Sequence, residues 1–188
     1  MGLLSQITTA LKISRKSVNI LVVGLDNSGK STIINHMKPS DARNNQITST
    51  IGYVNEQFFF NNTKFLVLDM SGQGKYRNLW ESHYKEIDGV IFVIDSTDQL
   101  RIAVARDELW LLLNHSDFML RKVPILVFAN KMEVNGSLTT SEISLFLGLN
   151  LISDHNWEIY ACCAITGQGL NYGFQWLLES IQACFEAN

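Results

Sequence analysis

GLDNSGKS, residues 24–31, follows an apolar run and precedes a helical pattern, and this stretch decides the fold. It matches the phosphate-binding pattern G-x-x-x-x-G-K-[ST], with Gly24, Gly29, Lys30 and Ser31 at the fixed positions. Glycines let backbone N–H groups converge on an anion, and the helix that follows adds its positive N-terminal end. The alternative is a plain glycine turn with an incidental lysine, but a chance match is on the order of one in a hundred. The stretch therefore predicts a phosphate-binding loop formed by Gly24, Leu25, Asp26, Asn27, Ser28, Gly29, Lys30, Ser31 and Thr32.

Short apolar runs on either side of this loop predict strands. Their continuous apolar character is typical of parallel strands that are covered on both faces. The expected strands are residues 18–23, 53–60, 64–69, 89–95, 124–130 and 157–162. Helical patterns lie between them at residues 30–37, 76–84, 101–113, 140–147 and 170–185.

One connection between strands is too short for a crossover helix. Only NNT separates residues 53–60 from residues 64–69, so these strands should form an antiparallel hairpin with Asn61, Asn62 and Thr63 at its tip. The expected fold is therefore α/β, with a six-stranded, mostly parallel sheet, one antiparallel edge strand and helices on both faces. Right-handed crossovers then place the loops that follow the strands along one rim.

Composition and charge narrow the functional classes. The 188 residues suit one domain, and 46% hydrophobic with 18% charged residues is globular rather than disordered composition. A net charge of −3 argues against broad binding to nucleic acid. Three cysteines, two of them adjacent, favour a reducing compartment over a disulfide framework. We expect a monomer with an amphipathic N-terminal helix at residues 1–16 and the main domain at residues 17–188.

DMSGQ, residues 69–73, follows a predicted strand and suits the terminal phosphate of a nucleoside triphosphate. Asp69 can support Mg²⁺ through its water shell, while the Ser31 hydroxyl ligates the ion directly. The Gly72 N–H can reach a γ-phosphate, and Gln73 can orient the attacking water as the catalytic residue. Thr50 can complete the Mg²⁺ shell, although on its own it also fits an ordinary surface threonine. These residues predict hydrolysis of a Mg²⁺-bound nucleotide.

Two later segments indicate which base is bound. NKME, residues 130–133, follows a strand, so Asn130 can bond the base edge and the Lys131 stem can pack along the ring. A carboxylate at Glu133 can accept the paired N1–H and N2–H₂ donors of guanine, which adenine lacks. Backbone N–H groups of Cys163 and Ala164, in CCAIT, can reach the guanine carbonyl. The predicted ligand is therefore GTP or GDP.

With FANK and IFVIDSTD between them, these motifs resemble the Arf family of small GTPases, from Gly2 to about Phe185. The resemblance implies a P-loop NTPase with the small G-protein fold, GTP/GDP exchange with Mg²⁺, and slow hydrolysis. It also implies a GTPase-activating protein, an exchange factor, and effector binding through two switch segments that include Ile51, Gly52, Tyr76, Leu79 and Trp80. Trp80 can equally be a core residue.

A narrower resemblance concerns one branch of this family. Most members have glycine where Ser71 stands here, so this serine favours one branch of the family. Four stretches resemble that branch: MGLL, DMSGQGKYRNLWE, LLNH and ILVFANKM. That branch implies recruitment of a coat-like effector complex, the BBSome, to membranes for ciliary protein trafficking. The implied location is the cytoplasm and the membrane periphery, at the cilium or its base.

The guanine motif departs from the family pattern at its last position. The family normally has aspartate where Glu133 stands, and glutamate is one methylene longer. A strained or lost charged hydrogen bond costs roughly 1–3 kcal/mol, about tenfold to hundredfold in affinity. We therefore expect weaker or faster-exchanging guanine nucleotides than in relatives.

The N-terminus departs from the pattern for myristoylation. Gly2 is present, but Gln6 stands where the pattern has Ser or Thr, so myristoylation is not expected. An apolar helical stripe remains, which suits an interfacial membrane helix released by GTP. A helix that stays in a groove of its own domain explains the same stripe. The stripe includes Leu3, Leu4, Ile7 and Leu11.

Two other functions use the same phosphate-binding loop. A small P-loop kinase would need an acceptor-binding lid with arginines, and the chain has neither a lid-sized insertion nor an arginine cluster. A nucleotide-stabilised scaffold with negligible turnover stays open, although Gln73 directly after Gly72 favours hydrolysis. The hairpin of residues 53–68 lies between the two γ-phosphate contacts, and the family resemblance implies that it slides in register between states. The alternative is a static edge hairpin.

Overall fold

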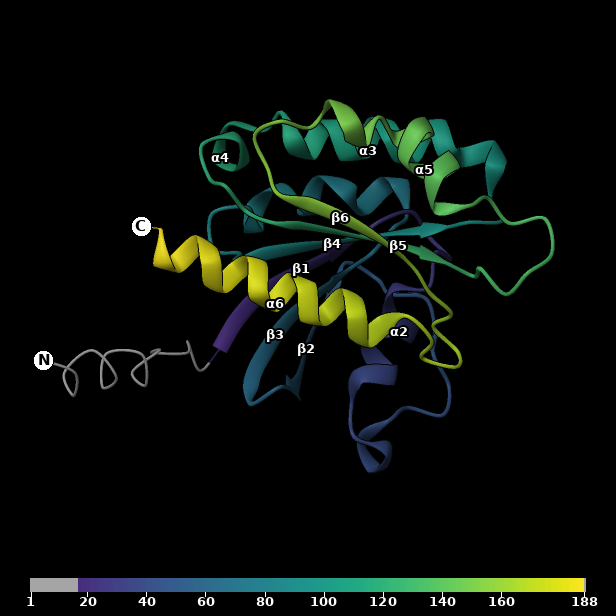
Figure 1. Ribbon diagram of the computed structural model, residues 1–188. Coiled ribbons are helices and arrows are strands. Elements are labelled where there is room, and N and C mark those ends of the chain that lie inside the picture. The colour runs from purple at the N-terminus through teal and green to yellow at the C-terminus, as the bar shows by residue number, and fades with distance from the viewer. Residues whose placement is uncertain (1–16, 188) are drawn as a thin grey trace, which may run out of the picture.

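A computed structural model of the chain describes residues 17–187 and confirms the α/β fold (Figure 1). Its single six-stranded sheet has the order β2-β3-β1-β4-β5-β6, and every neighbouring pair is parallel except β2 and β3. The predicted N-terminal helix lies outside the described residues. The strands are β1 (Ser17–Val23), β2 (Tyr53–Phe60), β3 (Thr63–Met70), β4 (Gly89–Asp95), β5 (Ile125–Asn130) and β6 (Trp157–Ala161).

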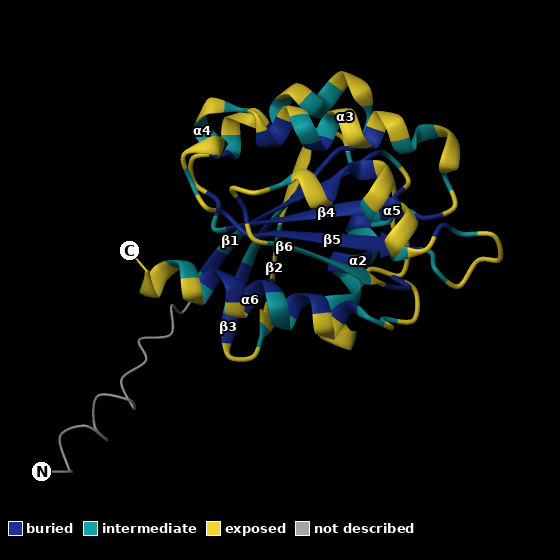
Figure 2. Cartoon of the chain, turned by 45° about the horizontal axis from the view of Figure 1, so that its top comes forward, coloured by how far each residue is buried: buried dark blue, intermediate teal, exposed yellow. Residues whose placement is uncertain are grey.

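Helices cover both faces of the sheet, as Figure 1 shows. α2 (Lys30–Met37) and α6 (Leu170–Glu186) lie on one face. The opposite face carries α3 (Ile102–Leu113), α4 (Ser116–Met119) and α5 (Thr140–Leu147). The central strands are therefore buried along their length, and exposure is concentrated on the outer sides of the helices (Figure 2).

The two cores follow from the alternation of side chains along each strand. In β1, Ile20 and Val22 join the cluster under α2 and α6, whereas Leu21 and Val23 join the cluster under α3 and α5. Successive side chains of a strand point to opposite faces, so a strand that is apolar at every position must be covered on both sides. This is why the continuous apolar runs indicate a parallel sheet.

The hairpin turn is shorter than predicted. Thr63 was expected at the tip, but it pairs with Phe60 as the first residue of β3 and is buried. The turn consists of Asn61 and Asn62, both with positive φ, 47° and 61°. Two-residue turns of this kind match the right-handed twist of the strands, and asparagine tolerates the left-handed conformation.

The helix expected at residues 76–84 is wrong in type. The chain there forms two 3₁₀ turns, Gly74–Leu79 and Glu81–His83, with hydrogen bonds such as Trp80 N to Arg77 O, 3.0 Å. The side chains of Arg77 and Trp80 reach back to carbonyl groups of the preceding loop, and this keeps the segment tightly wound. Helix α4 was not expected at all because one turn carries no periodic pattern.

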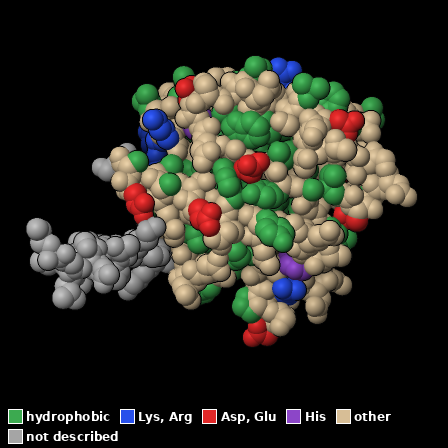
Figure 3. Space-filling view, viewed as in Figure 1, with side chains coloured by type: hydrophobic (Ala, Val, Ile, Leu, Met, Phe, Trp, Pro, Cys, Tyr) green, Lys and Arg blue, Asp and Glu red, His purple; other side chains and the backbone are tan. Residues whose placement is uncertain are grey.

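Two features would point to particular partners: a basic patch on the surface, and a helix that could span a membrane. Lys and Arg are few and scattered on the face in Figure 3, which shows no continuous basic patch. Within residues 17–187, no helix has the length and apolar character needed to cross a membrane.

Candidate functional site

The predicted site residues meet at the rim formed by the C-terminal ends of the parallel strands. The phosphate-binding loop follows β1, DMSGQ begins at the end of β3, and Asn130 ends β5. Strand β1 lies between β3 and β4, and the strand order reverses there: β2 and β3 are added on one side of β1, and β4, β5 and β6 on the other. Ligands of open α/β sheets bind at such a switch point.

Positive φ angles shape the phosphate-binding loop. Gly24 has φ 136°, and a Cβ atom there would stand 2.2 Å from the carbonyl oxygen of Val93. Gly29, at φ 98°, directly precedes α2, and a Cβ atom there would stand 2.2 Å from the side-chain nitrogen Nδ2 of Asn130. Both positions therefore require glycine, and the backbone N–H groups directly after Gly29 belong to the N-terminal end of α2, where anions bind.

Lys30 is buried inside the loop. Its ammonium donates to the carbonyl oxygens of Gly24 at 3.0 Å and Leu25 at 2.8 Å. Burial lowers the pKa of Lys30 to about 8, and the negative charges of Asp69 and Asp26 oppose that shift. A polyphosphate would add further negative charge and favour the protonated form, as phosphate binding requires.

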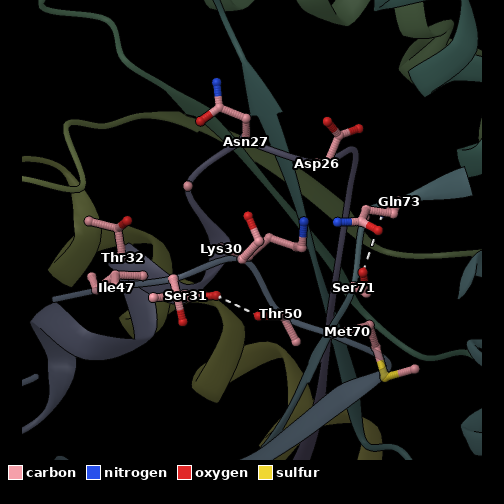
Figure 4. A pocket seen from close by; sticks show the side chains of 14 residues that line it. Asp26, Asn27, Lys30, Ser31, Thr32, Ile47, Thr50, Met70, Ser71 and Gln73 are labelled. Atoms are coloured by element: carbon pink, nitrogen blue, oxygen red, sulfur yellow. Dashed lines mark hydrogen bonds between the residues drawn. The ribbon is translucent and has the colours of Figure 1, made fainter.

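Three oxygen-bearing side chains, those of Ser31, Thr50 and Asp69, lie together next to Lys30. The Ser31 hydroxyl donates to Asp69 Oδ2 at 2.5 Å. It also lies 3.1 Å from the Thr50 hydroxyl, as Figure 4 shows. The second oxygen of Asp69, Oδ1, is buried without a hydrogen-bond partner among the described residues. Burial raises the pKa of Asp69, and hydrogen bonds from Ser31 together with the charge of Lys30 oppose the rise.

This donor set fits Mg²⁺. The ion prefers hard oxygen ligands, keeps several waters, and is commonly held by one or two protein oxygens together with phosphate. Ser31 and Thr50 supply hydroxyl oxygens, and the unpartnered Oδ1 of Asp69 can accept from a metal-bound water. No cluster of three or more His, Cys, Asp or Glu side chains suited to a metal occurs in the described part of the chain.

A cavity of about 200 Å³ opens over these groups. In Figure 4, Asp26 and Asn27 lie at one end, Ser31 and Thr50 at the other, and Lys30 between them. Sequence reasoning missed part of the wall, because it took only Thr50 from the polar segment before β2 and left out the second and third residues of DMSGQ. The additional lining residues are Ile47, Thr48, Ser49, Met70 and Ser71.

The predicted base-binding residues lie on the same rim, outside this cavity. Asn130 donates to the Ser28 carbonyl at 2.8 Å, and its side-chain oxygen accepts from the Ala164 N–H at 2.9 Å. Lys131 has φ 65° and donates to Asp95 at 2.7 Å. These bonds join the ends of β4, β5 and β6 to the phosphate-binding loop.

One base-side expectation needs correction, and it concerns Cys163. The Glu133 side chain is exposed, lies two residues after Lys131 as the motif requires, and stays a prediction as the acceptor for guanine. The Cys163 N–H, expected at the base, donates to the Gln168 carbonyl at 3.0 Å. Cys163 therefore closes its own loop, and the Ala164 N–H donates to Asn130 Oδ1, so both N–H groups are bonded within the protein in this conformation.

The switch residues differ in exposure. Ile51 is 74% exposed, and Leu79 is half-buried. Trp80 is 1% exposed in this conformation, so it belongs to the core and offers no surface to an effector, contrary to one of its two interpretations. Gly52 and Tyr76 are partly exposed.

An ion pair next to the site was also missed. Arg101 donates to the side chain of Asp26 at 2.8 Å and also contacts Asp98. No linear pattern connects Arg101 with a loop that far away in the sequence, and only the packing of the start of α3 against the phosphate-binding loop reveals the contact.

Comparisons with known proteins agree with this geometry. The model of the ADP-ribosylation factor family matches residues 4–181. The ADP-ribosylation factor-like protein 6 of Danio rerio is 49% identical over 97% of this chain and 98% of its own length. The protein of the same name from Caenorhabditis briggsae is 45% identical over 99% of this chain and 98% of its own.

A solved structure is similar over most of the chain. It is the Arl6 BBS3 small GTPase of Trypanosoma brucei with the bound nucleotide analogue GppNp, 42% identical with a TM-score of 0.82. The match covers 89% of this chain and 98% of that one. The chain therefore belongs to the ADP-ribosylation factor family, whose members bind GTP and GDP with Mg²⁺ and hydrolyse GTP.

Proposed function

We propose that this GTPase is a switch that, in its GTP state, recruits a coat-like effector complex of the BBSome type to membranes for ciliary protein trafficking. The observation that carries the proposal is the set of hydrogen bonds that joins the Ser31 hydroxyl to Thr50 and Asp69. Thr50 is followed directly by the exposed Ile51. The similarity to proteins named ADP-ribosylation factor-like protein 6, and to one also named BBS3, supports the choice of effector.

The γ-phosphate would act through two contacts. It is the only chemical difference between the two nucleotide states, so only groups that touch it can shift the conformational equilibrium. Thr50 and the Gly72 N–H are those groups, and both line the cavity. The ends of the two switches are joined by the Ser71 N–H, which donates to the Gly52 carbonyl at 2.8 Å. Hairpin β2–β3 connects them and would move with them.

Hydrolysis of GTP would be slow without a partner. Gln73 lines the cavity and would orient the attacking water as the catalytic residue. The arginine nearest to the loop, Arg101, is paired with Asp26 and Asp98. A GTPase-activating protein would supply a free arginine, which accelerates related enzymes by roughly 10³–10⁵.

Membrane attachment would come from residues 1–16, which lie outside the described residues. Leu3, Leu4, Ile7 and Leu11 would form the apolar stripe of an interfacial helix, and Lys12, Arg15 and Lys16 would contact anionic lipid. An exchange factor would load GTP at that surface, and the protein would act at the cilium or its base.

The test is capture of a purified BBSome by immobilised protein. Gln73→Leu loaded with GTP should retain the complex, and GDP-loaded wild type should not. Ile51→Asp in the Gln73→Leu background is the surface control, and it should lose capture while still binding GTP. Equal capture in both nucleotide states would refute the switch, and no capture in either would refute this effector.

Turnover is measured separately. Single-turnover hydrolysis of GTP, with and without cell extract as a source of activator, should show a slow basal rate that the extract accelerates. A rate that stays at background in both conditions would favour the nucleotide-stabilised scaffold.

A further inference from the structure

The indole of Trp80 makes a buried hydrogen bond to the switch loop. Its Nε1 donates to the Ser71 carbonyl at 3.1 Å, and the side chain is 1% exposed. A buried carbonyl that loses its donor carries a desolvation cost, so this bond constrains the peptide that contains it. That peptide is the one between Ser71 and Gly72.

The same peptide carries the Gly72 N–H. In a trans peptide the C=O and N–H groups point in opposite directions within one plane, and no cis peptide occurs in the described residues. Trp80 therefore holds the carbonyl on the core side, which directs the N–H to the other side. Gly72 lines the phosphate cavity, so that direction is toward the phosphate site.

The position of Gly72 is fixed as tightly as its orientation. A Cβ atom on this residue would stand 2.2 Å from the Asp26 nitrogen and 2.5 Å from the Gly24 carbonyl oxygen. The switch backbone thus lies directly on the phosphate-binding loop. Only rotation of the Ser71–Gly72 peptide plane is left to decide whether the N–H faces the phosphate.

A second side chain holds the next peptide. Arg77 Nε donates to the Gly72 carbonyl at 3.0 Å, and its Nη1 donates to Glu108 of α3 at 2.6 Å. The arginine and glutamate side chains are only 16% and 19% exposed. The N–H of that peptide, on Gln73, lies 3.4 Å from the Ser71 hydroxyl. The carbonyl groups of two successive peptides are therefore held by side chains, one by buried Trp80 and one by partly buried Arg77.

We propose that Trp80 and Arg77 are positioning residues for the γ-phosphate, because they hold the two peptides of Ser71-Gly72-Gln73 with the Gly72 N–H facing the phosphate. The inference rests on the proposed role of Gly72 as a γ-phosphate contact. Trp80 thus acts through its buried hydrogen bond to the Ser71 carbonyl and not through contact with an effector. Glu108 extends the chain of bonds to α3.

The test removes the indole N–H and keeps an aromatic ring. Trp80→Phe should weaken binding of the non-hydrolysable analogue GppNp by about threefold to tenfold, the range expected for one lost hydrogen bond. GDP affinity should stay within about twofold, because GDP has no γ-phosphate. A change in the ratio of the two affinities is a result that general loss of stability does not produce.

Trp110→Phe is the matched control. The Trp110 indole donates to the Leu147 carbonyl at 2.8 Å, which is the same kind of bond between α3 and α5, away from the phosphates. This variant should lower the melting temperature without changing the ratio of GppNp to GDP affinity. An equal change of ratio in both variants would overturn the proposal.

Arg77→Gln covers the case in which Trp80→Phe does not fold. It removes the bond to the Gly72 carbonyl from a partly exposed position and should lower the same ratio, while Arg106→Gln, an exposed arginine on α3, should not. Thr50→Ala separates the two hypotheses. If it leaves the ratio unchanged, the γ-phosphate contacts of the proposed function fail. If it lowers the ratio and neither Trp80→Phe nor Arg77→Gln does, only this inference fails.

Discussion

Lys30 carries a positive charge in a place that water barely reaches. Burial lowers the pKa of its ammonium to about 8, so at neutral pH the folded protein holds a charge that its surroundings disfavour. The unfolded chain has the ordinary pKa of 10.5 and binds more protons between about pH 8 and pH 10.5. Stability therefore rises with pH in that window, as the buried ammonium loses its proton.

This gives a prediction for Lys30→Met in nucleotide-free protein. The wild type should gain unfolding free energy relative to the variant as pH rises from 8 to 10.5, by up to about 3 kcal/mol. Urea unfolding at several pH values measures the difference, in which all other titrating groups cancel. A difference that does not change with pH would contradict the buried-charge argument. The variant should also lose nucleotide binding.

Glu133 is the second residue whose chemistry can be tested alone. Its side chain is exposed and one methylene longer than the aspartate usual in the family. Glu133→Asp should slow GDP dissociation by up to about tenfold, because the shorter side chain relieves bent hydrogen bonds to the base. Release of a fluorescent GDP analogue measures the rate.

The control for Glu133 is the same substitution away from the base. Glu86→Asp changes another exposed glutamate, near the 3₁₀ turns, and should leave the dissociation rate unchanged. An equal rate in Glu133→Asp and wild type would refute the strain argument. ATP binding as tight as GDP binding would refute guanine selectivity altogether.

At the scale of elements, the strands could be predicted from sequence and the switch segment could not. Apolar runs locate all six strands to within one residue, because burial on both faces requires apolar residues at every position. The segment at Gly74–Leu79 was misjudged because Arg77 and Trp80 bond to carbonyls of the preceding loop. Such bonds cannot be detected from the spacing of apolar residues in the sequence.

Some residues of the candidate site could be predicted from sequence and others could not. The glycine-rich loop and Asn130 could be predicted because each is a local pattern at a strand end, and parallel strands bring those ends together. The pairing of Asp26 with Arg101 could not, because it depends on where the start of α3 packs. The Cys163 N–H was misplaced because its partner, Gln168, lies in a turn of its own loop.

The hairpin turn provides a test at this scale. Asn62 has φ 61°, which glycine adopts without strain and a β-branched residue does not. Asn62→Gly should change the unfolding free energy by no more than about 1 kcal/mol, and Asn62→Val should lower it by about 1–2 kcal/mol. Urea unfolding compares the two, and equal destabilisation would contradict the two-residue turn.

At the scale of the whole molecule, the structure offers a docking place for the N-terminal segment. A groove of about 490 Å³ lies beside β1, where the described chain begins, and its lining includes Asn19, Leu68 and Ile87. Glu56 and Glu86 also line it, and residues 1–16 contain basic but no acidic side chains. The groove and an anionic membrane would thus compete for the same apolar, basic segment.

The competition should depend on nucleotide. In the proposed function the GTP state would order the switches around the γ-phosphate, and hairpin β2–β3, which forms one wall of the groove, would move with them. Full-length protein loaded with GppNp should therefore sediment with anionic liposomes, and GDP-loaded protein should remain in the supernatant. Ile7→Asp, on the apolar stripe, should abolish sedimentation, whereas Ser5→Asp adds the same charge off the stripe and should retain most of it. Equal sedimentation in both nucleotide states would mean that the segment binds lipid independently of the switch. No sedimentation in either state would mean that it stays in the groove, because the same apolar stripe cannot be buried in both places at once.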